Sequence, residues 1–485
     1  MGASGLWMLP ATMLLMAISG LPAWIVLIST SMVFAMGGLL FGMFTLRVFF
    51  ALPLRMLGLL EHDLLQALPL YVLIGAMLNH LPLAEILFRV VNRILRRTAA
   101  APYLAGMGLG VLLAPMNGSV GASVAMLART IQPRLEAHAL PPERSAALIC
   151  TASTIGVVVP PSLVLILLSD AMMRAHTEAI NVTHEATRII NTQDIFHGAL
   201  LPASVMLLLF FFVTWWRNRT ASTTAFIPTV IDTIKFSVNR SDWIIALCSV
   251  ACILVLLILV TLGYLYAVEG AATGGLALFL FGLITRSLTG PVFKAILHDT
   301  LAITGALFAL LVAATGYTLV LRAFEADVWM NDFLRGLSGG GSTALIVVLL
   351  ILALSAFILD AFEITFVIIP VVMPPLLMLV PDATWVAVLT LLVLQSSFLL
   401  PPFGYAVLMA NSVLKRKLSQ KALARALLPY LLAQFAIMLL VLMWPNMIWH
   451  SNSNPSSNET NNQQLSDKQV QDLYEQQRLE NEKID

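Results

Sequence analysis

Charged residues are scarce in this sequence. Asp, Glu, Lys and Arg make up 11% of the 485 residues, whereas soluble domains carry about 25%, and hydrophobic residues make up 59%. Met1–Leu46 contains no charged residue at all. Such a chain cannot cover its surface with polar side chains, which excludes a soluble globular protein. Because about 20 apolar residues cross the roughly 30 Å of hydrocarbon in a bilayer, the recurring apolar runs predict an all-α polytopic membrane protein with about ten to twelve spans. Closed β-barrels would instead show short alternating segments.

Other absences narrow the function. The three cysteines, Cys150, Cys248 and Cys252, lie in apolar runs and are interpreted as packing thiols rather than redox or metal groups. The net charge of +1 gives no reason to expect a nucleic-acid partner. No GxxxxGK[ST] or HExxH motif occurs, so neither ATP hydrolysis nor another enzymatic activity is expected. The N-terminus lacks a basic stretch before its apolar run and is therefore predicted to be a first span, not a cleaved signal.

Basic residues concentrate in a few connections between the apolar runs, which predicts their cytoplasmic location. They are Arg89, Arg93, Arg96 and Arg97, then Arg217, Arg219, Lys235 and Arg240, then Arg286 and Lys294, and finally Lys415, Arg416, Lys417, Lys421 and Arg425. The connection 170–195 and the segment Glu325–Asp332 are not basic in balance and are predicted to lie outside. The Asn- and Gln-rich tail 450–485 cannot bury a core and is predicted to be disordered or a short interfacial helix.

Polar breaks interrupt the apolar runs at matching places in two halves. In the first half, Asn117 precedes the pair Pro160–Pro161 by 43 residues; in the second half, Asp360 precedes the pair Pro401–Pro402 by 41. Proline removes a backbone donor and disfavours helix at the residue before it. A broken helix inside a membrane is tolerated where its freed carbonyls line a cavity or bind something, and paired breaks in two halves indicate a secondary transporter's site. The alternative is that these are ordinary proline kinks.

Ionisable groups inside apolar runs tend to mark solute or ion paths. Asp360 and Glu363 are three residues apart and are predicted to share one helical face. The alternative is a hydrogen-bonded structural pair or a helix end. Gln395, together with Ser396 and Ser397, could reach the same cavity, although Ser and Gln also link membrane helices.

An ordered set of segments resembles the large membrane subunit of tripartite ATP-independent periplasmic (TRAP) transporters, the DctM-like family. The resemblance extends from about Gly20 to Trp449. Three features resemble the mannitol/chloroaromatic branch: the residue sequence of the first break, the extra stretch Ala171–Asp194 and the sequence FEITFVIIP. The segments are Gly20–Gly38, Asn117–Ser123, Thr154–Ser162, Asp194–Ala203, Tyr266–Gly274, Phe357–Ile364 and Ser397–Ala406.

The resemblance implies an elevator-type transporter of the bacterial inner membrane, built from two inverted repeats with re-entrant helical hairpins. It implies sodium as the coupling ion and no other cofactor. It also implies, besides membrane lipid, a small four-helix membrane subunit and a periplasmic solute-binding protein as partners. Because the chain begins with the large-subunit signature, the small subunit is expected to be a separate polypeptide. The implied substrate is a small organic acid, such as a 2-oxo acid or another carboxylate.

The resemblance also implies site residues. A first sodium site would use Asn117 and Ser119 with backbone groups at Gly156, Val159 and Pro161. A second would use Asp360 with Ser397, Leu400 and Phe403, although Ser397 and Leu400 replace a Gly and a Thr that are usual in the family. Substrate would lie between the hairpin tips, near Ser123, Ser162, Glu363, Gln395 and Gly404. No embedded arginine obviously pairs with a carboxylate, so half-helix N-termini are expected to bind it.

These observations predict a chain of two halves. The first is 1–216, with a hairpin and broken helix at about 103–170; 217–242 is a cytoplasmic linker; the second half is 243–449, with a hairpin and broken helix at about 343–413. The predicted function is sodium-coupled import of a small organic acid delivered by the binding protein. The alternatives are a stand-alone ion-coupled anion transporter of similar fold and, less favoured, a membrane-embedded enzyme or scaffold.

Overall fold

The structure is a computed structural model that describes residues 5–61, 63–95, 98, 100–114, 120–137, 141–160, 162–184, 188–219, 239–401, 404–414 and 419–448. These residues belong to one compact unit, Met1–Trp449. The predicted tail 450–485 and most of the predicted linker 217–242 lie outside the described residues, so those boundaries stay predictions.

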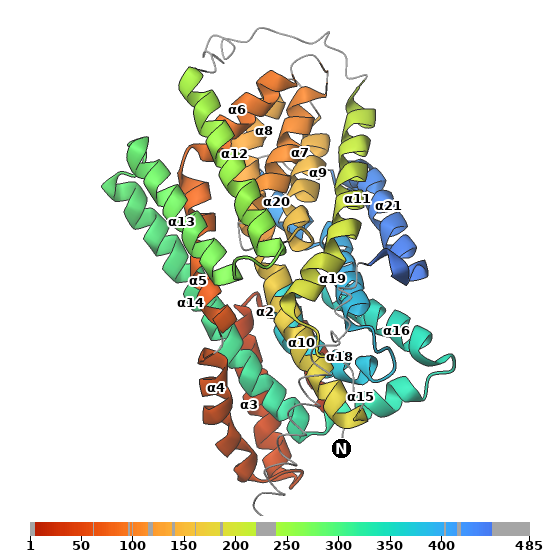
Figure 1. Cartoon of the computed structure of the whole chain (residues 1–485). Helices are drawn as coiled ribbons and strands as arrows, with labels where there is room; N and C mark the ends of the chain where they lie inside the picture. Colours follow the sequence, from red (N-terminus) through yellow and green to blue (C-terminus); the bar gives the residue numbers. More distant parts are fainter. Residues whose placement is uncertain are drawn as a thin grey trace, which may run out of the picture. The chain divides into compact units, whose positions relative to one another are not determined.

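Helices are the only regular elements in the described ranges, and Figure 1 shows how they run. In the first half they are α2 Met8–Ser19, α3 Ala23–Leu40, η1 Leu46–Phe50, α4 Ala51–Leu60, α5 Asp63–His80, α6 Leu83–Ile94, α7 Ala101–Leu113, α8 Val120–Ala137, α9 Pro142–Thr154, η3 Ile155–Val157, α10 Leu163–Thr183 and α11 Thr192–Asn218. In the second half they are α12 Arg240–Thr261, α13 Ala267–Ile284, α14 Gly290–Ala323, α15 Ala326–Arg335, α16 Gly340–Ser355, α17 Ala361–Glu363, η6 Ile364–Ile368, α18 Ile369–Leu377, α19 Ala383–Leu399, α20 Tyr405–Val413, α21 Gln420–Met443 and η7 Pro445–Met447.

Six of the described helices are long and apolar enough to cross a bilayer: α3, α11, α12, α13, α14 and α21. The sequence estimate of ten to twelve spans is higher because it also counted apolar runs that the structure divides into shorter helices. These shorter helices include α7, α16 and α19, which belong to the hairpins and broken helices. Many large apolar side chains on the long helices are exposed, as expected for surfaces that face lipid.

The packing of the helices repeats with the two halves exchanged. In the outer group, α2 packs on α3 as α12 packs on α13, and α3 packs on α14 as α13 packs on α5. In the inner group, α7 packs on α9 as α16 packs on α19, while α8 packs on α20 as α18 packs on α10. The hairpin helices α7 and α8 lie toward one end of the unit and α16 and α18 toward the other (Figure 1). This is the arrangement of two inverted repeats with re-entrant hairpins that the family resemblance implies.

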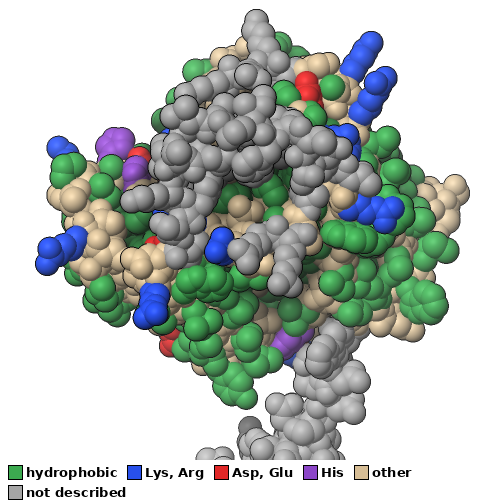
Figure 2. All heavy atoms as spheres, turned by 90° about the horizontal axis from the view of Figure 1, so that it is seen from above, with side chains coloured by type: hydrophobic (Ala, Val, Ile, Leu, Met, Phe, Trp, Pro, Cys, Tyr) green, Lys and Arg blue, Asp and Glu red, His purple; other side chains and the backbone are tan. Residues whose placement is uncertain are grey.

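The two ends of the unit differ in charge. Helix α6 and the C-terminal end of α11, which carry Arg89, Arg93, Arg217 and Arg219, lie at the upper end in Figure 1, and α4 and α15 lie at the lower end. Figure 2 looks onto the upper end and shows Lys and Arg side chains projecting around its rim. The upper end therefore agrees with the predicted cytoplasmic side.

Candidate functional site

The first broken helix ends at a proline pair. An α-helix would bond the carbonyl of Gly156 to the amide of residue 160 and the carbonyl of Val157 to the amide of residue 161, but proline has no amide hydrogen at either position. Instead, the amides of Val158 and Val159 both donate to the carbonyl of Ile155, at 3.1 and 3.2 Å. Gly156 and Val157 are fully enclosed in this short 3₁₀ turn. Their carbonyls therefore have no helical donor.

Ser162 restarts the helix after the first break. It has extended backbone angles, and its hydroxyl accepts a hydrogen bond from the amide of Leu165 at 3.1 Å, which makes it the N-cap of α10. Its side chain is only 1% exposed. Because the hydroxyl accepts in this cap, its hydrogen is still available to donate to a ligand.

The second broken helix also ends at a proline pair, but its chain is held there by different hydrogen bonds. Helix α19 ends at Leu399, and Leu400 is its C-cap. The amide of Leu400 donates to the carbonyl of Ser397 at 3.2 Å, and its carbonyl accepts from the amide of Gly404 at 2.8 Å. A Cβ on Gly404 would lie 2.5 Å from the carbonyl oxygen of Phe398. Only glycine lets the chain fold back this closely on the end of α19. The hydroxyl of Ser397 donates to the carbonyl of Val393 at 2.9 Å, so its hydrogen is already used.

Asp360 and Glu363 form a capping box at the turn of the second hairpin. Asp360 has extended backbone angles, its carboxylate accepts from the amide of Ala361 at 2.7 Å, and its own amide donates to the Glu363 carboxylate at 3.0 Å. They therefore do not share one face of a continuous helix, as the spacing suggested, because Asp360 precedes the first helical residue. The structure shows both acids in a hydrogen-bonded capping box, and their role at an ion or substrate site stays a prediction. The next turn, Ile364–Ile368, is a π-helix, a form found frequently at functional sites.

Part of the predicted first site lies outside the described residues. This applies to Asn117, Ser119, Pro161 and, in the second site, Phe403. Ser123, on α8 just after the first hairpin turn, is described: it is 1% exposed and its hydroxyl has no hydrogen-bond partner among the described residues. An unsatisfied buried hydroxyl is costly, which favours a ligand or water beside it.

The two halves meet around these breaks. A Cβ on Gly121 of α8 would lie 3.2 Å from the Tyr405 hydroxyl of α20, and the Cys150 thiol of α9 donates to the Ala406 carbonyl at 3.5 Å. In the mirrored position, α10 contacts both α17 and η6. The start of α8 therefore lies against the helix that follows the second break, and α17 and η6 lie against the helix that follows the first.

A glutamine pair joins the second break to α21. Gln434 donates to the side-chain oxygen of Gln395 at 3.3 Å and to the Leu392 carbonyl at 3.3 Å, and both glutamines are fully buried. The amide nitrogen of Gln395 has no partner among the described residues. Sequence reasoning selected Gln395 but missed Gln434 and Tyr405. The available signal for Gln434 was that a glutamine is embedded in the apolar run Ala426–Trp449.

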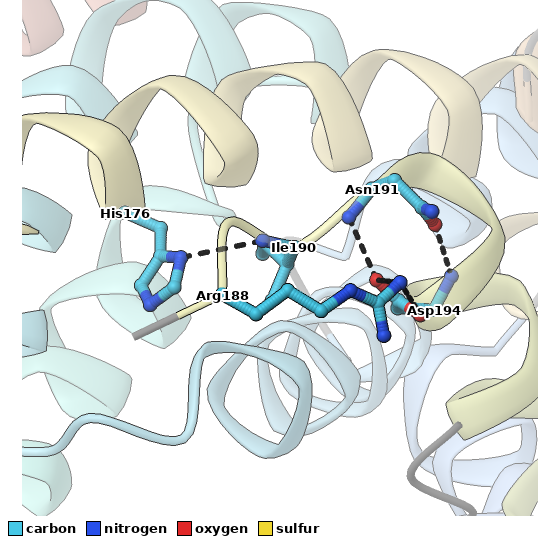
Figure 3. A network of polar contacts seen from close by, with 5 residues as sticks. All are labelled: His176, Arg188, Ile190, Asn191 and Asp194. Atoms are coloured by element: carbon cyan, nitrogen blue, oxygen red, sulfur yellow. Dashed lines mark hydrogen bonds and ion pairs between the residues drawn. The ribbon is translucent and has the colours of Figure 1, made fainter. Parts of the chain in front are cut away.

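The extra stretch Ala171–Asp194 extends α10 and then caps α11. Figure 3 shows the amide of Ile190 pointing at His176, to which it donates at 3.5 Å, while Asn191 and Asp194 exchange backbone and side-chain hydrogen bonds of 2.8 and 2.9 Å. Arg188 lies 3.2 Å from both Asp194 carboxylate oxygens. Asp194, which opens the family-like segment Asp194–Ala203, is thus the N3 residue of a capping box whose N-cap is Asn191.

The donors around the breaks suit a hard monovalent cation. No group of three or more His, Cys, Asp or Glu side chains that could hold a metal occurs in the part of the chain that the structure describes. What the breaks offer is backbone carbonyls, hydroxyls and one capped carboxylate pair. Unwound carbonyls of this kind coordinate sodium in broken transporter helices, so the residues fit that ion.

Comparison with known proteins places this arrangement in a family. The family model of the tripartite ATP-independent periplasmic transporter DctM component matches residues 11–447. The chain is 20% identical over 386 residues to the C4-dicarboxylate TRAP transporter large permease protein DctM of Rhodobacter capsulatus, covering 78% of this chain and 84% of that protein. It is 20% identical over 389 residues to the 2,3-diketo-L-gulonate TRAP transporter large permease protein YiaN of Escherichia coli, covering 79% and 85%.

A solved structure supports the fold. The YdaH transporter of Alcanivorax borkumensis superposes with a TM-score of 0.62 at 16% identity, over 83% of this chain and 89% of that one. The DctM family consists of transport permeases of tripartite systems, and its members are multi-pass proteins of the bacterial inner membrane. With the family model matched along nearly its whole length, this chain belongs to the DctM family of TRAP transporter large permeases.

Proposed function

We propose that this chain is the permease subunit of a sodium-coupled importer of a small organic acid. The family match supports the transport role, and the dicarboxylate and diketogulonate in the names of two relatives are both organic acids. The DctM family also supports two partners, a small membrane subunit and a periplasmic binding protein that delivers the solute. The exposed apolar side chains of the long helices contact lipid.

The observation that carries the proposal is the pair of proline-terminated breaks, each adjacent to the other half's hairpin. In the first sodium site, the carbonyls of Gly156, Val159 and Pro161 act together with Asn117 and Ser119. In the second, the Asp360 carboxylate acts with carbonyls at Ser397, Leu400 and Phe403. Gly156 and Ser397 occupy the same position in their breaks, four residues before the first proline of each pair.

The substrate lies between the two hairpin turns. Ser123 and Gln395 each hold a buried polar atom without a partner among the described residues, and Ser162 can still donate its hydroxyl hydrogen. These groups form hydrogen bonds with an acid's oxygens, while Glu363 and Gly404 shape the opposite wall. During transport the inner group of helices, α7 to α10 and α16 to α20, moves against α3, α5, α13 and α14.

Reconstituted uptake tests the proposal. The full chain is placed in proteoliposomes with its small subunit, and labelled organic acids are offered together with the binding protein. Accumulation that requires both an inward sodium gradient and the binding protein is expected. Accumulation driven equally by potassium would contradict sodium coupling.

The alternative, a stand-alone ion-coupled anion transporter, makes a different prediction in the same assay. Uptake would then persist when the binding protein is left out.

A further inference from the structure

A cavity lies at the lower end of the unit, away from the two breaks. Its volume is about 400 Å³, within the range of about 300–1,000 Å³ typical of small-molecule sites. Five elements form its walls: α4, α10, α14, η6 and α18. We call it the arginine cavity, after the three arginines that line it, Arg55 of α4, Arg174 of α10 and Arg322 of α14.

The charges in the arginine cavity do not balance. Its lining includes two carboxylates, Asp170 and Glu178, so the five ionised groups leave a net charge of +1. Arg174 bonds Asp170 within α10 at 3.1 Å. Arg322 bonds Glu178 at 2.7 Å. Arg55 forms no ion pair with any carboxylate in the described ranges, and guanidinium groups stay charged at all relevant pH values.

The position of these arginines runs against the usual charge distribution. The arginine cavity is lined by the C-terminal parts of α10 and α14 and by α4, and Figure 1 shows α4 at the end of the unit opposite to that of the basic rim. Arginine is normally enriched on the cytoplasmic side of a membrane protein. A cluster of three on the predicted outer side therefore calls for a role beyond topology.

The Arg322–Glu178 bond joins the two groups of helices. Arg322 belongs to α14, which packs on α3 and α5, whereas Glu178 belongs to α10, which packs on α18. The other wall of the cavity is η6 and α18, where Thr365 lies two residues after the Glu363 of the capping box. The second hairpin thus forms one wall of the arginine cavity, and the Arg322–Glu178 ion pair bridges the cavity.

We propose that the arginine cavity binds the carboxylate of the incoming solute, with Arg322 and Arg55 as its cationic partners. Glu178 occupies the place of that carboxylate when no solute is bound. When an acid binds, its carboxylate replaces that of Glu178 on Arg322, so the guanidinium of Arg322 keeps an anionic partner. The bound carboxylate also neutralises the excess positive charge at Arg55. Sequence reasoning expected no arginine for this role. The proposal rests on the proposed import of organic acids.

The test compares substitutions of two residues that form an ion pair with each other and that should change carboxylate binding in opposite directions. Purified full-length chain is titrated with sodium succinate and with sodium pyruvate, against sodium chloride at equal ionic strength, and binding is followed by the rise in melting temperature. Arg322→Gln and Arg55→Gln should each weaken carboxylate binding by about tenfold, which equals about 1.4 kcal/mol. Glu178→Gln should tighten it, because it frees Arg322.

Matched variants protect this test from folding artefacts. Arg335→Gln on α15 removes an arginine that does not line the arginine cavity and should leave binding unchanged. Arg322→Lys keeps the charge and should retain part of the affinity if Arg322→Gln fails to fold. A purely structural ion pair predicts that Glu178→Gln and Arg322→Gln change binding in the same direction. That result, or no carboxylate binding by the native chain, would overturn the proposal.

Uptake separates this proposal from the proposed function. Sodium-driven uptake that is unaffected by all three variants would remove the arginine cavity from the solute path and leave the transport function intact. Carboxylate binding with the expected signs, but without sodium-driven accumulation, would leave the cavity as a binding site and refute the importer.

Discussion

The two breaks share a backbone plan but differ in their polar chemistry. In the first, Gly156 lies four residues before the proline pair, and a hydroxyl, that of Ser162, caps the next helix. In the second, Ser397 stands at the matching position, and no side-chain cap bonds the start of α20, where Gly404 provides the close backbone approach. The hairpin beside the first break's following helix carries the two acids, Asp360 and Glu363.

This difference separates what the fold needs from what the chemistry needs. Both halves need a helix that stops, because the proline pairs withhold the same two amide donors. Only the second half places carboxylates at its hairpin turn, so the two proposed ion sites would differ in charge. A cation bound near Asp360 neutralises a carboxylate, whereas a cation held by carbonyls at Gly156 adds a charge to an uncharged pocket. We therefore expect the halves to respond differently to equivalent substitutions.

The largest effect is expected where glycine permits a close approach. Gly404→Ala would place a Cβ 2.5 Å from the Phe398 carbonyl oxygen, a backbone atom that cannot move aside cheaply. We expect a loss of about 1–3 kcal/mol in stability, as for overpacked cores, together with loss of uptake. Gly110→Ala, which would meet Ala152 of α9 at 2.5 Å, is the first-half counterpart.

Thermal unfolding of the purified chain measures both variants. Gly316→Ala on α14 is the control, because a Cβ there meets nothing within 4 Å. It should leave the melting temperature unchanged or raise it, since alanine favours helix by up to about 1 kcal/mol. If Gly404→Ala melts like the native chain, the second break is looser than its geometry indicates.

A smaller effect should separate the two roles of Asp360, as a helix cap and as an anion. Asp360→Ala removes both and should cost about 0.5–2 kcal/mol of stability from the lost cap, along with sodium-driven uptake. Asp360→Ser keeps a capping hydroxyl, as Ser162 does in the first half, but removes the charge. It should keep the native melting temperature and still lose sodium-driven uptake. Native uptake by Asp360→Ser would show that the carboxylate serves only as a cap.

Local features of this site could be predicted from sequence because they follow from covalent chemistry. Proline at 160 and 401 withholds a donor whatever the surroundings, so the positions of both breaks follow from the chain itself. The relation of Asp360 to Glu363 was harder to predict. A spacing of three suits both a shared helical face and a capping box, and only the extended backbone of Asp360 decides between them.

Contacts between distant segments could not be predicted in this way. The approach of Gly121 to Tyr405 joins residues far apart in the chain, and nothing local encodes it. The arginine cavity was missed for a different reason. Asp170, Arg174 and Glu178 recur every fourth residue and form one face of a helix. The charge balance of 170–195 predicts an outer connection there, whereas α10 continues to Thr183.

The smallest expected effect concerns Leu400, where the sequence departs from the family pattern. Its backbone is extended, with φ −78° and ψ 110°, so a β-branched residue fits there without strain. Leu400→Thr would add a hydroxyl oxygen beside the second site and should lower the sodium concentration for half-maximal uptake by about threefold, or about 0.6 kcal/mol. Leu400→Val has the same shape without the oxygen and is the control. Equal sodium dependence in the two variants would mean that residue 400 contributes only its backbone carbonyl, as we propose for Val159 in the first half. The proposed second ion site would then be complete without a hydroxyl.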